Sequence, residues 1–176
     1  MAQDSLPSSQ PSFARWWRQV LFVPMLHSNW LTAEVKARLT TKVTSAERGH
    51  RGEVFLVIEN HLPIQSAYST SCRERAVELF SSYRVWDTEE NTGVLVYVNI
   101  CEHSLEIVAD RGISAHVSPT VWRAMCDKAV AGIANRKVEE SLTDLLDEIG
   151  QLLSQYYHLE HDPAGNELSD TVVFLK

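Results

Sequence analysis

The sequence has few cysteines and fewer basic than acidic residues. The three cysteines, Cys72, Cys101 and Cys126, lie far apart and form no CxxC pair. This usage argues against a disulfide framework and a zinc knuckle, and it fits reduced, partly buried thiols in a reducing compartment. Sixteen Lys and Arg against 23 Asp and Glu give a formal net charge of −7. We therefore expect no nucleic acid as the main partner, because phosphate contacts supply most of the affinity for it.

The N-terminal part lacks the pattern of a secretory signal or of a membrane-spanning helix. Residues 1–12 are polar and carry no early basic cluster. The apolar stretch 20–26 is interrupted by Pro24 and is far shorter than the roughly 20 residues of a spanning helix. No EF-hand spacing, P-loop, GxGxxG or GxSxG motif is present either. We expect a cytoplasmic protein and leave a peripheral contact with a membrane open.

The composition is typical of one globular domain with short additions at both ends. The 176 residues are 44% hydrophobic and 22% charged, which is ordinary for a folded domain of this size. We interpret the chain as four consecutive parts. These are a disordered tail over 1–12, an amphipathic aromatic and basic segment over 13–30, a domain over 31–160 and a C-terminal extension over 161–176.

Residues 13–26, FARWWRQVLFVPML, combine aromatic with basic side chains. Trp16 and Trp17 stand beside Arg15 and Arg18 in a short amphipathic pattern. Two interpretations remain open. The segment docks its tryptophans on the domain, or it lies on a membrane surface or a protein partner.

Two apolar, β-branched runs, 53–59 and 93–100, predict buried central strands. A helix predicted over about 73–83 joins them, so the two strands should run parallel through a right-handed crossover. Residues 104–110 alternate in polarity after a tight turn near Glu102 and His103. They predict an antiparallel hairpin partner of the second strand.

Further helices flank these strands. Thr32 is a candidate N-cap for a helix that Gly49 ends, and two more helices are predicted from Pro119 and over 138–157. The last apolar run, 171–175, fits an edge strand or an extended arm. This order of elements predicts an α/β fold, a three-layer αβα sandwich around a small mixed β-sheet.

Acidic residues gather at one end of the predicted sheet, where the first and second strands begin and the third ends. The residues placed there are Glu47, His50, Glu53, Asp87, Glu89, Glu90, Asn91, Asp110, Arg111 and Gly112. Carboxylate, amide and carbonyl oxygens together suit a hard cation, so we predict a site for Ca²⁺ or Mg²⁺. Its predicted ligands are Asp87, Glu90, Asn91 and Asp110.

Two functions are compatible with such a site. In the first, a binding or accessory module holds the cation, or a basic partner, without turnover. In the second, a metal-assisted phosphatase of low specificity uses His50 or Glu53 to handle protons and Arg111 to balance charge. A plain structural interpretation also stands, because 87–91 has the composition of a solvated turn and Asp110 with Arg111 fits an exposed ion pair.

The run 84–98, RVWDTEENTGVLVYV, followed by 105–113, LEIVADRGI, resembles the core signature of the TPM domain family. Asn91, Gly93 and Gly112 match its polar loop and its hairpin glycine. The resemblance extends over about 32–157 and implies an αβα sandwich around a mixed sheet. The family includes a protein with a proposed acid phosphatase activity, relatives reported to bind divalent cations, and non-enzymatic accessory proteins. The chain resembles a soluble bacterial branch of this family.

Overall fold

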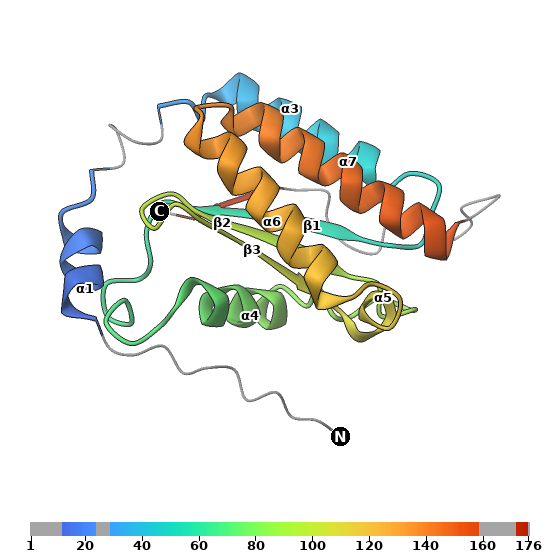
Figure 1. Cartoon of the computed structure of the whole chain (residues 1–176), viewed down its shortest axis with the longest axis horizontal. Coiled ribbons are helices and arrows are strands. Elements are labelled where there is room, and N and C mark those ends of the chain that lie inside the picture. Colours follow the sequence, from blue (N-terminus) through green and yellow to red (C-terminus); the bar gives the residue numbers. More distant parts are fainter. Residues whose placement is uncertain (1–11, 24–28, 159–171, 176) are drawn as a thin grey trace.

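In the computed structural model, residues 12–23, 29–158 and 172–175 are described. They form a four-stranded sheet with helices on both faces (Figure 1). The strands are β1 (Val54–Glu59), β2 (Val94–Asn99), β3 (Ser104–Ala109) and β4 (Val173–Leu175). The helices are α1 (Phe13–Val20), α3 (Ala33–Ala46), α4 (Cys72–Ser82), α5 (Arg111–Ser114), α6 (Pro119–Ala134) and α7 (Val138–Tyr157). Residues 1–11, 24–28, 159–171 and 176 lie outside the described residues, and with them most of the predicted tail over 1–12 and of the predicted extension over 161–176.

The sheet has the order β3-β2-β1-β4. β1 and β2 are parallel with Val54 opposite Val94, and β3 pairs antiparallel with β2, with Ala109 opposite Val94. The predicted parallel pair and hairpin are therefore confirmed. β4 pairs parallel with β1, so the apolar run at the end of the chain contributes an edge strand rather than an extended arm.

The helix ends follow local capping chemistry. The Thr32 hydroxyl accepts a hydrogen bond from the Val35 amide at 3.3 Å, as its N-cap role predicts. α4 begins with a capping box in which Ser71 and Glu74 exchange hydrogen bonds with each other's backbone amides. Among the described residues, no helix is both long and apolar enough to cross a membrane.

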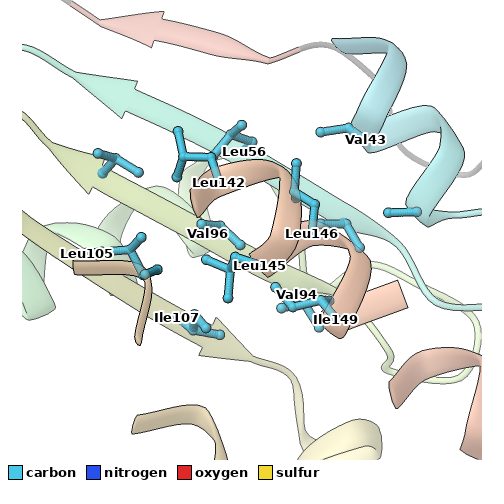
Figure 2. Close-up of a cluster of buried hydrophobic side chains, with 14 of the residues drawn as sticks. Val43, Leu56, Val94, Val96, Leu105, Ile107, Leu142, Leu145, Leu146 and Ile149 are labelled. Atoms are coloured by element: carbon cyan, nitrogen blue, oxygen red, sulfur yellow. The ribbon is translucent and has the colours of Figure 1, made fainter. Parts of the chain in front are cut away.

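The strands are buried because each face of the sheet has its own helical cover. Figure 1 shows α3, α6 and α7 over one face and α4 over the other. Alternate strand residues point to opposite faces, so β1 and β2 contribute side chains to both layers. On the three-helix side, the core residues labelled in Figure 2 are Val43, Leu56, Val94, Val96, Leu105, Ile107, Leu142, Leu145, Leu146 and Ile149. This is the three-layer α/β sandwich that the order of elements predicts.

Candidate functional site at the start of the strands

The segments that enter β1 and β2 and leave β3 are joined by backbone hydrogen bonds at one end of the sheet. The Val94 amide donates to the Glu53 carbonyl at 2.8 Å. The Asp110 amide donates to the Gly93 carbonyl and the Gly112 amide to the Asn91 carbonyl, both at 2.9 Å. Residues 87–93 and 110–112 are therefore neighbours, and we call them the loop edge. Gly93 lies opposite Asp110.

Two glycines of the loop edge are required by close backbone contact. A methyl group on Gly93 would overlap the carbonyl oxygen of Val85, and one on Gly112 would overlap the carbonyl oxygens of Glu90 and Asn91. Asn91 itself has a φ of 55°, a left-handed conformation that asparagine adopts more readily than most residues. The Asn-and-glycine pattern of the sequence thus reflects tight packing of two loops.

The two carboxylate oxygens of Asp110 differ in their hydrogen bonding. One oxygen, Oδ1, accepts from the Arg111 amide at 2.7 Å and caps α5. The other, Oδ2, is buried and has no hydrogen-bond partner within the described part of the chain. A buried carboxylate oxygen without a donor is costly, so this atom marks a place where a cation or a donor group would be stabilised.

The other predicted metal ligands are engaged with arginines. Asn91 Oδ1 accepts from Arg111 Nε at 2.9 Å, and Glu90 forms an ion pair with Arg51. Asp87 is exposed, and its Oδ2 lies 4.0 Å from Arg84 Nη1. Over residues 12–23, 29–158 and 172–175, no group of three or more His, Cys, Asp or Glu side chains could hold a metal ion. The four-ligand site stays a prediction.

His50 is enclosed at the turn before β1 and is 4% exposed. Its Nδ1 accepts from the Gly52 amide at 3.1 Å, so the proton of the neutral ring belongs on Nε2, which lies 2.6 Å from the Ala46 carbonyl oxygen. Burial lowers the pKa of His50, and His158 nearby lowers it further. Both ring nitrogens are thus occupied by backbone groups, which is the arrangement of a structural histidine.

The remaining acidic and basic candidates at this end differ in exposure. Glu53 is buried, whereas Arg111 is exposed. Glu47 accepts the Val54 amide at 2.9 Å and so helps to begin β1. At the loop edge Asp87 and Arg111 are therefore exposed and Asp110 is half-buried, while His50 and Glu53 lie inside the domain. The catalytic roles predicted for His50, Glu53 and Arg111 stay predictions.

A second polar group, which sequence reasoning missed, lies at the opposite end of the sheet. Glu59 is 2% exposed and pairs with Arg75, whose Nη2 lies 2.8 Å from Glu59 Oε1. The Tyr97 hydroxyl donates to Glu59 Oε2 at 2.6 Å, and Asn99 Nδ2 donates to the Tyr97 oxygen at 2.8 Å. We call these four residues the buried polar network.

The network fixes the ionisation of its members. Burial and the Glu59 charge raise the pKa of Tyr97, so the hydroxyl keeps its proton. Burial opposes the charge of Arg75, but its hydrogen bonds to Glu59 and Glu78 raise its pKa. The nearby Cys72 thiol has a pKa raised to about 12, chiefly by burial. The sequence does contain a signal for this network, because each of the two apolar strands ends in a polar residue, Glu59 or Asn99. These two residues are paired in the register of β1 and β2.

Comparison with known proteins agrees with this architecture. The model of the TPM domain family matches residues 26–152. The NMR structure of the BA42 protein from the psychrophilic bacterium Bizionia argentinensis is similar with a TM-score of 0.71 and 23% identity, over 81% of this chain and 94% of that one. The N-terminal domain of a protein from P. gingivalis is similar with a TM-score of 0.60 and 12% identity, over 74% of this chain and 82% of that one. These two structures bear on the fold alone. No curated protein matches the chain.

Proposed function

This chain belongs to the TPM domain family, and we propose that its domain is a binding or accessory module that holds a divalent cation, Ca²⁺ or Mg²⁺, at the loop edge. The observation that carries the proposal is the buried Oδ2 of Asp110, which has no hydrogen-bond partner among the described residues. A divalent cation would supply the missing positive charge at that atom.

The chemistry of the loop edge fits a weak site with few charged ligands. Asp110 would provide the carboxylate, and the oxygens of Glu90 and Asn91 are the next donors, since both residues pack against Gly112. Arg51 and Arg111 already hold the side chains of Glu90 and Asn91, so a cation has to compete with two guanidinium groups. We expect a dissociation constant on the order of 10⁻⁴ to 10⁻³ M, as in other low-affinity calcium modules.

The alternative, a metal-assisted phosphatase, has weaker support. A general base must reach the proton that it removes, but both ring nitrogens of His50 are engaged with backbone groups. Burial also lowers the pKa of His50 and so favours its neutral form. Arg111 is exposed and could contact a phosphate, yet an exposed arginine suits binding as well as turnover.

Thermal unfolding in EDTA, and then in excess Ca²⁺ or Mg²⁺, tests the cation site. At ten times the dissociation constant, binding to the native state stabilises it by about 1.4 kcal/mol, which raises Tm by roughly 3–6 °C in a domain of this size. Asp110→Asn should lose the shift. Asp127→Asn, an exposed change on α6, is the matched control and should keep it.

Two further arms sharpen the result. Asp87→Asn decides whether this exposed residue belongs to the ligand set, since loss of the shift would include it. An equal metal shift in Asp110→Asn, or no shift in the wild type at about 10 mM metal, ten times the weakest expected dissociation constant, contradicts the proposal. Hydrolysis of a generic phosphomonoester that stops both in EDTA and in Asp110→Asn would replace the accessory role with the enzymatic one.

A further inference from the structure

Polar side chains attach helix α1 to the domain, and its Trp17 is exposed. Gln19 is 1% exposed, and its Oε1 accepts from the Leu62 amide at 2.9 Å while its Nε2 donates to Glu102. Arg18 Nη1 lies 3.0 Å from Glu102 Oε2. The inner side of α1 is therefore its hydrophilic side, the reverse of the arrangement expected for a helix that packs on a core.

A second set of polar bonds holds α1 against the segment after β1. Arg15 Nε donates to the Ala67 carbonyl at 2.9 Å, and Arg15 Nη2 donates to the Tyr68 carbonyl at 3.0 Å. The Ser12 amide also donates to the Tyr68 carbonyl, at 3.0 Å. These contacts fix the orientation of the helix and bring Tyr68 beside it.

The outer side of α1 is apolar and exposed. Phe13, Trp17, Val20 and Leu21 follow the spacing of one helical face, and Phe13 is 64% and Leu21 70% exposed. The exposed Tyr68 extends this surface, because its ring meets that of Phe13 edge-on with centroids 6.3 Å apart. We call these five residues the aromatic face.

We propose that the aromatic face is a docking surface for the interface of a lipid bilayer that contains anionic lipid. Phe, Trp and Tyr rings favour the boundary between head groups and acyl chains. Arg15 donates to backbone carbonyls and therefore keeps its positive charge beside this face, where it attracts anionic head groups, whereas Arg18 is paired with Glu102. No acidic residue lies on α1, so the helix itself carries only positive charge.

Charge and area favour a bilayer over a second copy of the chain. Two copies would each bring a net charge of −7, which opposes their association. An eight-residue helix is about 12 Å long and covers far less than the roughly 800 Å² per partner of a stable protein interface. A bilayer needs no such area, because inserted side chains each contribute separately.

The position of α1 also suits a planar surface. Figure 1 shows α1 and α5 at opposite ends of the molecule. When α1 rests on a bilayer, the loop edge beside α5 therefore points away from it. Because the chain as a whole is acidic, attachment should depend on insertion of the aromatic face. The local charge of Arg15 is what should make binding weaker on vesicles without anionic lipid.

Vesicle flotation of the full chain tests the proposal. We expect binding to phosphatidylcholine vesicles that contain phosphatidylserine, and less binding to phosphatidylcholine alone. Trp17→Ser with Leu21→Ser should weaken the binding about tenfold or more, since two inserted apolar side chains are lost. Val121→Ser with Tyr156→Ser removes two exposed apolar residues from other helices and should leave binding unchanged.

A second measurement guards against an indirect effect of the substitutions. Lipids brominated near the head group should quench the tryptophan fluorescence of the wild type, and Trp17→Ser should lose most of this quenching while its Tm stays unchanged. Absence of vesicle binding, or binding that Trp17→Ser with Leu21→Ser leaves intact, overturns the proposal. A concentration-dependent dimer that the same pair of substitutions abolishes would assign the aromatic face to self-association instead.

Discussion

The two ends of the sheet both carry ionisable groups, but they hold them in different surroundings. At the loop edge the charges lie on loops and meet arginines that are largely exposed, as in the pair of Arg51 and Glu90. At the other end Glu59 and Tyr97 belong to strands, and their polar atoms are buried and paired with each other and with Arg75. The first arrangement leaves side chains available to a ligand, whereas the second uses them to join β1, β2 and α4.

This difference has energetic consequences. An exposed ion pair contributes about 0–1 kcal/mol, because water and salt screen it. A buried pair adds little net stability when it is intact, but removing one partner leaves a buried charge unpaired, which costs about 3–5 kcal/mol. Substitutions that break an ion pair at one end or the other should therefore differ several-fold in their effect on the free energy of unfolding, and similar effects would show that the contrast is wrong.

The largest effect is expected from Arg75→Met. The substitution keeps most of the side-chain volume but leaves Glu59, which is 2% exposed, without its cation. We expect a loss of about 3 kcal/mol in the free energy of unfolding, measured by urea denaturation at neutral pH. The matched control is Arg38→Met, which breaks an exposed pair with Glu139 and should change stability little. Equal losses in both variants would contradict a buried, charge-dependent network.

Gly93→Ala should produce the next largest loss, at the other end of the sheet. The added methyl group would overlap the Val85 carbonyl oxygen, so the loop or the strand must move. We expect a loss of about 2–3 kcal/mol in the free energy of unfolding. Gly49→Ala isolates backbone strain, since Gly49 has a φ of 83° and open space around it, and should lose only about 1 kcal/mol. Equal stability of Gly93→Ala and Gly49→Ala would mean that the backbone at the loop edge shifts at little cost in free energy.

Much of the fold could be predicted because the strongest sequence signals are local. β1 and β2 are apolar on both faces, and a helix lies between them, so their burial and parallel direction follow from pattern and chain connectivity. Thr32 and Gly49 likewise mark the ends of a helix within a few residues. The strand directions alone were enough to predict that Asp87, Asn91 and Asp110 lie at the same end of the sheet.

The rest depends on side-chain orientation, which connectivity does not determine. Glu59 and Tyr97 meet because their strands are in register and because α4 turns Arg75 toward them. At the loop edge, arginines engage acids that composition alone suggested as metal ligands. In α1 the tryptophans correctly indicated an amphipathic helix. The pattern did not show that Gln19 lies on the buried side of this helix, because its hydrogen-bond partners are 43 and 83 residues away in the sequence.

The pH dependence of stability should report His50. Because burial lowers its folded-state pKa below 6.5, the unfolded chain binds the proton more tightly than the native state. The contribution of His50 is therefore complete above pH of about 6.5 and is lost as pH falls toward the folded-state pKa. His50→Gln should be less stable than the wild type at pH 8 but should lose less stability between pH 7 and pH 5, values chosen to bracket the unfolded-state pKa. His103→Asn, at an exposed turn position, should keep the wild-type slope.

The smallest change in stability is expected from Arg51→Gln, yet it bears most directly on the loop edge. Loss of the exposed pair with Glu90 should cost less than about 1 kcal/mol and should become smaller at high salt. If the loop edge binds a divalent cation, the same change frees the Glu90 carboxylate and should enlarge the metal-dependent rise in Tm. Lys42→Gln, which breaks a pair with Asp147 on the helical layer, should leave that rise unchanged. A smaller metal response in Arg51→Gln would show instead that the arginine organises the loop, and that Glu90 acts through its ion pair rather than as a ligand.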